Sequence, residues 1–342
     1  MSILSNVTKL YNTYGVKLKT DMHLLLMYWR DIDGVGVDKS AISTPDFLSK
    51  TTTCSRDILQ AKLMWKILEE DKLKQKGIKH MNKSPLKWVG GKSKLIKKLL
   101  PIFPKHKGYV EVFGGSAIML LNKDVSKWEI LNDFDSNLMN FWSVVQNAHD
   151  QLIKSFEWEV VSRERFQEYK EKYKTNNYDD AIERAKVFYY LVKAGFGADM
   201  KNPVFGTGKD RNRLRVEQVE QSIKETHERI HKVTIENKSF EDLFRIYDSE
   251  DTFFYLDPPY RNTKQYATGK FTDEQYELMR DCCASTKGKW LITINNDDHI
   301  RELFQEFNIM DHEVFYSVCK TDNGRTEFKE LIITNYDVNF NQ

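Results

Sequence analysis

The chain has 342 residues, of which 40% are hydrophobic and 30% are charged. This is the composition of an ordinary folded protein, and it excludes intrinsically disordered and fibrous classes. No stretch approaches 18 uncharged apolar residues, and the N-terminus lacks the pattern of a secretory signal, so we expect no membrane association. The four cysteines form no CxxC pair, which argues against a disulfide framework and a zinc site. These features predict a reduced, cytoplasmic protein that needs no metal.

The net charge of +2 is unevenly distributed along the chain. Residues 1–83 contain 14 Lys and Arg against 9 Asp and Glu, whereas the remainder contains 38 against 41. A basic leading segment before a slightly acidic body favours an anionic partner.

Residues 1–80 have the pattern of a helical extension. Asp21–Trp29 is an apolar run, Ser43–Pro45 is a helix-start signal, and an amphipathic pattern follows from Ser55. The order of these segments resembles a helix-turn-helix or winged-helix module that would bind DNA. A helical arm packed on the main body is an equally open interpretation.

Beyond residue 84, short β-branched and aromatic runs alternate with helical stretches. This alternation predicts an α/β fold whose parallel sheet is covered by helices on both faces. The predicted strands are Val110–Phe113, Glu129–Leu131, Thr252–Leu256, Trp290–Ile294 and Leu331–Thr334. The charged, helix-rich stretch 151–238 interrupts the alternation, and we interpret it as an insertion between core segments 84–150 and 239–342.

The sequence TFFYLDPPY, Thr252–Tyr260, carries the most specific chemical signal. Its two prolines cannot continue a strand, so the strand must end by Asp257, at the edge where parallel sheets bind ligands. The Asp257 carboxylate and the Pro258 carbonyl form an acceptor pair for an amino group. The ring of Tyr260 offers a stacking surface for a flat base. A proline-rich turn without a ligand is the alternative.

Two further strand ends carry residues suited to a cofactor. Tyr109–Ala117 (YVEVFGGSA) ends in an acid and an aromatic before two glycines that permit a tight turn, although it lacks GxGxxG. Ile130–Asn137 (ILNDFDSN) places Asp133 where a carboxylate can accept hydrogen bonds from ribose hydroxyls, with Phe134 beside it. The alternative is that Asp133 or Asp135 caps the next helix.

The stretch Leu86–Leu95 (LKWVGGKSKL) contains Gly91–Lys92–Ser93 but is not a phosphate-binding loop. That loop requires a glycine at position 86, where leucine stands, and no strand precedes it.

Taken in their order along the chain, these four stretches resemble the motifs of the D12-class (α-group) N6-adenine DNA methyltransferases, which include the Dam-type enzymes that methylate GATC. The K-W-x-G-G-K stretch is Lys87–Lys92, the glycine motif is Glu111–Ala117, the ribose-binding acid is Asp133, and D-P-P-Y is Asp257–Tyr260. The resemblance covers about residues 84–336, and it implies a Rossmann-like methyltransferase core with a helical target-recognition insertion.

The resemblance implies transfer of a methyl group from S-adenosylmethionine to N6 of an adenine flipped out of duplex DNA. Asp257, Pro258 and Tyr260 would be catalytic, with Tyr260 stacked on the base. The implied cofactor-binding residues are Trp88, Lys92, Glu111, Phe113, Gly115, Asp133, Phe134, Phe240 and Asp257. The family occurs in prokaryotes and their phages, so such a source is expected.

Recognition of the DNA sequence is less well defined. The stretch Gly195–Gly208 corresponds to the Dam-type recognition hairpin but contains no arginine, the commonest reader of guanine. Lys87 matches a lysine that contacts guanine in Dam-type enzymes, so GATC remains open. The DNA-contact candidates are Lys87, Lys201, Asn202, Lys209, Arg211 and Arg213; the alternative for each is a solvated surface side chain.

Two other functional classes remain open at this stage. The protein could be a DNA-binding regulator with a vestigial methyltransferase core, or an N-methyltransferase acting on RNA or on glutamine side chains. The intact D-P-P-Y motif argues against the regulator, and the order of the motifs favours duplex DNA.

Overall fold

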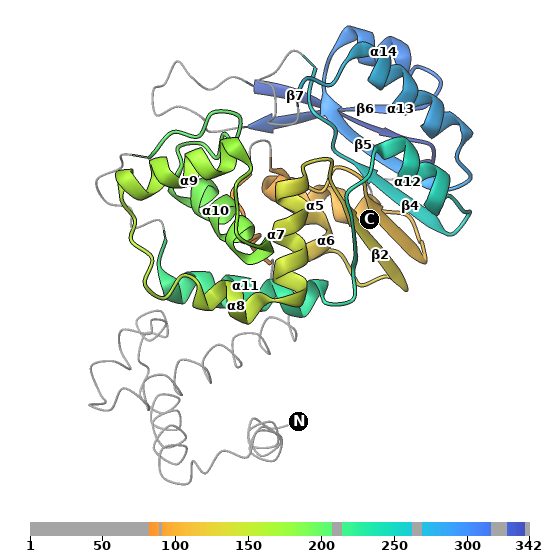
Figure 1. Cartoon of the computed structure of the whole chain (residues 1–342). Helices are drawn as coiled ribbons and strands as arrows, with labels where there is room; N and C mark the ends of the chain where they lie inside the picture. The colour runs from red at the N-terminus through yellow and green to blue at the C-terminus, as the bar shows by residue number, and fades with distance from the viewer. Residues whose placement is uncertain (1–81, 89–90, 207–213, 262–268, 316–326, 339–342) are drawn as a thin grey trace, which may run out of the picture. The chain divides into compact units, whose positions relative to one another are not determined.

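The computed structural model of the chain describes residues 82–88, 91–206, 214–261, 269–315 and 327–338. The predictions for residues 1–80 lie outside these ranges, as do Lys209, Arg211 and Arg213. Within the described ranges, seven strands form one sheet (Figure 1). The strands are β1 (Gly108–Glu111), β2 (Trp128–Asn132), β3 (Thr234–Glu236), β4 (Thr252–Leu256), β5 (Lys289–Asn295), β6 (Asn308–Phe315) and β7 (Glu327–Thr334).

The helices precede, connect and cover these strands. They are α5 (Ile96–Leu99), α6 (Ile118–Asn122), α7 (Ser136–Asn147), α8 (His149–Lys154), α9 (Arg163–Thr175), α10 (Ala181–Ala194), α11 (Val216–Ile230), α12 (Phe240–Tyr247), α13 (Asp273–Ser285) and α14 (Asp298–Leu303). Two 3-10 helices, η1 (Lys92–Lys94) and η2 (Leu100–Ile102), flank α5.

The strand order across the sheet is β3-β2-β1-β4-β5-β7-β6. Strands β1 to β5 are parallel, whereas β7 runs antiparallel to both β5 and β6. The α/β class is confirmed, and each predicted apolar run overlaps a strand. The expectation of a wholly parallel sheet was wrong at Leu331–Thr334. Only eleven residues separate β6 from β7, too few for the helical crossover that a parallel pair requires.

The strands β3 and β6 were not predicted. The strand β3 has only three residues, and β6 lies at the sheet edge with the mixed polar sequence NIMDHEVF. Neither segment has the continuous apolar run that identified the central strands.

Alternate residues of the central strands enter two hydrophobic clusters on opposite faces of the sheet. Phe253 and Tyr255 of β4 belong to the cluster that includes α6, α7 and α10. Phe254 and Leu256 belong to the cluster that includes α12, α13 and α14. Because successive side chains of a strand point to opposite faces, a strand buried on both sides reads as an uninterrupted apolar run.

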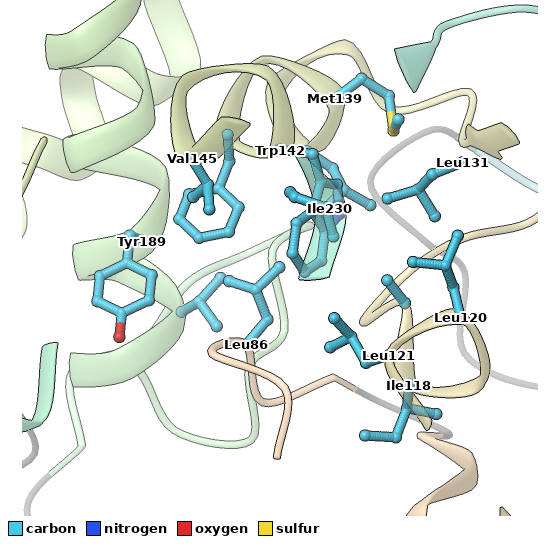
Figure 2. Packing of buried hydrophobic residues seen from close by; sticks show 14 of the residues in the cluster. Leu86, Ile118, Leu120, Leu121, Leu131, Met139, Trp142, Val145, Tyr189 and Ile230 are labelled. Atoms are coloured by element: carbon cyan, nitrogen blue, oxygen red, sulfur yellow. The ribbon is translucent and has the colours of Figure 1, made fainter. Parts of the chain in front are cut away.

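The helices of the predicted insertion pack against the core. The rings of Phe141 in α7 and Tyr189 in α10 are stacked, with centroids 5.4 Å apart. Figure 2 shows Tyr189 and Ile230 among buried residues of α6, α7 and β2, in the same cluster as Leu86. Thr234–Glu236 pairs with β2, so these three residues belong to the sheet although they fall within 151–238. The division into domains otherwise stays a prediction.

A buried ionic cluster joins the insertion to the sheet. The Glu129 carboxylate on β2 accepts hydrogen bonds from Arg229 of α11 at 2.6 and 3.0 Å, one to each oxygen. The ammonium of Lys123 lies 2.5 Å from Glu129 Oε1. Burial acts to raise the pKa of Glu129, but Arg229 and Lys123 outweigh it and hold that pKa below its usual value.

We expect Glu129→Gln to lower the free energy of unfolding by about 3 kcal/mol at neutral pH, because two buried cations lose their charged partner. Since the pKa of Glu129 is depressed in the folded chain, the wild-type advantage is complete above the unfolded-state pKa of about 4.3. It is lost as the pH falls through the lower, folded-state pKa. Urea unfolding from about pH 3.5 to pH 7 measures this difference.

The control for this prediction is Glu220→Gln, which removes an exposed pair with Lys224 on α11. That change should alter stability by less than about 0.5 kcal/mol. Equal effects of the two substitutions would contradict a stabilising role for the buried cluster.

Candidate functional site

The carboxyl ends of three adjacent parallel strands meet at one edge of the sheet. Glu111 is the last residue of β1, Asp133 is the first residue after β2, and Asp257 is the first residue after β4. In the sheet register, Glu111 is opposite Leu131 on one side and Tyr255 on the other. This edge is where open α/β sheets bind their ligands, and it brings together strand ends that are far apart in the sequence.

The turn after β1 requires glycine at two positions. A Cβ on Gly114 would lie 2.7 Å from the carbonyl oxygen of Asn132, and one on Gly115 would lie 2.8 Å from the indole nitrogen of Trp88. Gly115 also has a φ of +48°, which side chains disfavour. The turn therefore follows the end of β2 closely on one side and the Trp88 ring on the other.

Ala117 is strained where it begins α6. Ala117 has a φ of 52° and is fully buried, and the left-handed region costs a non-glycine residue about 1–2 kcal/mol. This backbone conformation is the physical reason why glycine suits the position.

Asp133 is held by backbone amides at the end of β2. Its Oδ2 accepts from the amide of Gly115 at 3.0 Å, and its Oδ1 accepts from the amide of Asp135 at 3.0 Å. Burial raises the pKa of Asp133 to about 6, although both amides act in the opposite direction. Asp135 caps α7, accepting from the amides of Asn137 and Leu138, so Asp133 is not needed as the cap of that helix.

Several aromatic rings lie near the glycine turn. Phe113 lies 6.1 Å from Phe240 and 5.8 Å from Phe271, measured between ring centroids. Trp88 is half-buried, whereas the side chain of Phe134 is 65% exposed. Phe271 was not predicted from the sequence, because no recognised motif lies near it. The fold brings its ring next to those of Phe113 and Phe240.

Glu111 is buried at the end of β1 and faces α6. Its Oε2 accepts from the hydroxyl of Tyr109 and from the amide of Leu120, each at 2.8 Å. Burial raises the pKa of Glu111 to about 8, with a further contribution from the nearby charge of Asp257. The fold thus uses one carboxylate oxygen of this predicted cofactor residue to position α6.

A network of charged and hydroxyl groups surrounds Asp257. The Lys92 ammonium lies 2.7 Å from Asp257 Oδ1 and donates to the hydroxyl of Tyr260 at 2.6 Å. That hydroxyl donates to Glu330 Oε1 at 2.7 Å, and Thr293 donates to Asp257 Oδ1 at 3.1 Å. Burial raises the pKa of Asp257, Lys92 acts to lower it, and Glu330 acts to raise it. The sequence predicts Lys92 as a cofactor-binding residue. In the structure, its ammonium contacts the side chains of Asp257 and Tyr260 in the D-P-P-Y motif.

Residues outside the motif hold the turn after Asp257. The hydroxyl of Tyr276 donates to the carbonyl of Pro259 at 2.6 Å, and Asn295 exchanges hydrogen bonds with the backbone of Arg261. Sequence reasoning missed these residues and also Thr293 and Glu330. Only their position on neighbouring strands and helices relates them to the motif.

Three of the predicted DNA-contact residues lie in the part of the chain that the structure describes, and all three are at the surface. Lys87, Lys201 and Asn202 are all exposed, and the side chain of Asn202 accepts from Lys170 at 2.9 Å. Near Lys87, Lys193 of α10 donates to the carbonyl of Pro85 at 3.1 Å. Burial lowers the pKa of Lys193 to about 8, and the charge of Lys87 acts in the same direction.

The chain around these candidates forms an antiparallel turn at the start of the glycine-dotted stretch. The amide of Phe196 donates to the carbonyl of Val204 at 2.7 Å, and that of Gly206 donates to Ala194 at 3.0 Å. Phe196 and Val204 are exposed on it.

The described residues contain no group of three or more His, Cys, Asp or Glu side chains arranged to hold a metal ion. Across the same part of the chain, no helix has the length and apolar character needed to cross a membrane.

Comparison with known proteins identifies relatives of this arrangement. The model of the D12 class N6 adenine-specific DNA methyltransferase family matches residues 88–318. Type II methyltransferase M.CviBI of Paramecium bursaria Chlorella virus NC1A is 28% identical over 260 residues, covering 73% of this chain and 98% of the relative. Type II methyltransferase M.MjaIII of Methanocaldococcus jannaschii is 29% identical, with coverage of 73% and 98%. The DNA adenine methylase of Escherichia coli K12 is 26% identical, with coverage of 73% and 94%.

The match begins at Trp88 and includes the glycine turn, Asp133 and Asp257–Tyr260, the same residues that the sheet brings to one edge. The family and the Escherichia coli relative are named for adenine in DNA, which does not support RNA or glutamine side chains as the substrate. The family match extends over most of the chain. The protein belongs to the D12 class of N6 adenine-specific DNA methyltransferases.

Proposed function

We propose that this methyltransferase uses S-adenosylmethionine to methylate N6 of an adenine flipped out of duplex DNA. The observation that carries the proposal is that two groups of residues, one suited to a cofactor and one to a base, lie at the same edge of the sheet. The glycine turn with Asp133 lies at the ends of β1 and β2, and Asp257 with Tyr260 lies at the end of the adjacent β4. A methyl donor and a base bound there would meet across neighbouring strands.

The residues of the glycine turn are suited to the cofactor. Gly114 and Gly115 let the turn pack closely against the end of β2 and the Trp88 ring, and Asp133 presents a carboxylate fixed by two amides. The residues proposed to hold S-adenosylmethionine are Trp88, Lys92, Glu111, Phe113, Gly115, Asp133, Phe134, Phe240 and Asp257. When bound, S-adenosylmethionine supplies a methyl group on a positively charged sulfur.

The residues after β4 are suited to an adenine amino group. The nitrogen lone pair of that group is delocalised into the ring, which makes it a weak nucleophile. In the proposed mechanism, the Asp257 carboxylate and the Pro258 carbonyl each accept one amino hydrogen and thereby localise the lone pair on nitrogen. The raised pKa of Asp257 supports its taking the proton that the amino group loses. Tyr260 stacks on the flipped base.

Binding of the duplex is proposed for the insertion and the N-terminal extension. Target recognition would use residues 151–238, with DNA contacts from Lys87, Lys201, Asn202, Lys209, Arg211 and Arg213. The basic segment 1–80 would add sequence-independent affinity. With DNA as substrate, the protein would act in the cytoplasm of a prokaryotic cell, encoded by the host or by a phage.

Expression in a methylation-free bacterial host tests the function directly. Sequencing of the host DNA should find N6-methyladenine within one short motif. In Asp257→Asn the transfer rate should fall by about 10³-fold, because the amide cannot accept the proton. The matched control is Asp251→Asn, an exposed carboxylate just before β4. Unmodified DNA despite folded wild-type protein that binds S-adenosylmethionine would reject the proposal, and would favour RNA or a protein as the substrate, or the need for a partner.

Binding of S-adenosylmethionine to Asp133→Asn tests the cofactor site separately. Titration calorimetry should give about 10–100-fold weaker binding, because a charged acceptor is lost. Since the pKa of Asp133 is about 6, wild-type affinity should decline as the pH falls below that value, and the variant should lose this dependence. Asp242→Asn, on the surface of α12, is the control. Unchanged affinity in Asp133→Asn would place the ribose elsewhere.

A further inference from the structure

Glu330 lies at the carboxyl edge of the parallel strands because β7 runs in the opposite direction. In the sheet register it is opposite Asn295, the last residue of β5, and His312 of β6. An antiparallel strand enters the sheet at the edge where the parallel strands end. A residue near its beginning therefore reaches the groups that follow β4.

The Glu330 side chain is 1% exposed. Removing a carboxylate from water is costly, so a buried one requires hydrogen bonds or an opposite charge. Its Oε1 accepts from the hydroxyl of Tyr260 at 2.7 Å and lies 4.0 Å from the Lys92 ammonium. Both contacts connect Glu330 to the D-P-P-Y centre.

The direction of the hydrogen bonds follows from the chemistry of the donors. An ammonium only donates, so the Tyr260 oxygen must accept from Lys92. The single hydroxyl hydrogen of Tyr260 then points to Glu330. The Tyr260 ring is thereby held at its outer end by two partners, one on each side of its oxygen.

We propose that Glu330 is a positioning residue of the methyl-transfer site, one that holds Tyr260, and through it Lys92, in place beside Asp257. This role rests on the proposed function. In that function Tyr260 supports the target base and Asp257 receives its amino group, so a displaced Tyr260 ring would misalign the base. Glu330 itself need not touch the substrate.

The charge of Glu330 also acts on Asp257, because the two carboxylates share one ammonium. Several polar groups from the surrounding strands and the segment before β1 influence Asp257. They are Lys92 of η1, Glu111 of β1, Tyr255 of β4, Thr293 of β5 and Glu330 of β7. Glu330 acts to raise the pKa of Asp257, so its neutralisation should leave Asp257 ionised to lower pH.

Steady-state methylation of unmethylated DNA by the full chain tests the role. We expect kcat to fall about 10-fold in Glu330→Gln and about 100-fold in Glu330→Ala, with the dissociation constant for S-adenosylmethionine changed less than about 3-fold. The acid limb of the pH–kcat profile should move to lower pH in Glu330→Gln. A merely structural contact would not move that limb.

A double-mutant cycle tests whether Glu330 affects kcat through the hydroxyl of Tyr260. If Glu330 acts through the hydroxyl of Tyr260, then at a pH well above the acid limb the double variant with Glu330→Gln and Tyr260→Phe should be no slower than Tyr260→Phe alone. Additive losses would overturn the proposal. Tyr260→Phe removes the same hydrogen bond from the other side, so it tests the contact even where Glu330→Ala does not fold.

Glu129→Gln is the matched control, since Glu129 is another buried, ion-paired carboxylate on a strand of the same sheet. It should lower stability but leave kcat and the pH profile unchanged. If the wild-type enzyme is active and Glu330→Gln has the same kcat and pH profile as the wild type, the positioning role alone is overturned. A wild-type enzyme that does not methylate DNA would overturn the proposed function and this role with it.

Discussion

The ammonium of Lys92 lies between two carboxylates, and the candidate active site is organised around it. Its partners are Asp257, which follows β4, and Glu330, which lies in β7. Lys92 itself stands before β1 and is 3% exposed. A cation so deeply buried is stable only when it is paired and hydrogen-bonded, so three distant parts of the chain must meet at one point. The segment before β1 is thereby attached to the edge of the sheet.

The position of β1 between β2 and β4 gives this edge its two functions. On one side, the glycine turn contacts the end of β2, and Asp133 is held by the amides of Gly115 in the turn and of Asp135, the N-cap of α7. On the other side, Asp257 emerges from β4 beside Lys92. Parallel pairing makes all three strand ends coincide, so no long loop is required to bring a methyl donor and an acceptor base together. The left-handed backbone at Ala117 is strain stored at this same edge.

Much of the central sheet could be predicted from local pattern. The runs TFFYL and WLITI are predominantly apolar because β4 and β5 contribute buried side chains to both hydrophobic clusters. The strand β3 is too short for such a signal, and β6, at the edge of the sheet, mixes polar and apolar residues without a continuous apolar run. The direction of β7 depends on its pairing with β5 and β6, which is a long-range contact that no local pattern encodes.

The sequence alone determined the residue types of the site and their family, because D-P-P-Y, the glycine turn and Asp133 each follow a recognisable strand. The tertiary structure decided which of them touch. It brings Lys92 to Asp257 and Tyr260, adds Phe271 to the aromatic cluster, and places Glu330 against the Tyr260 hydroxyl. The physical reason is that strand ends and motifs are local features, whereas partners of a buried charge are chosen by the packing of the whole sheet.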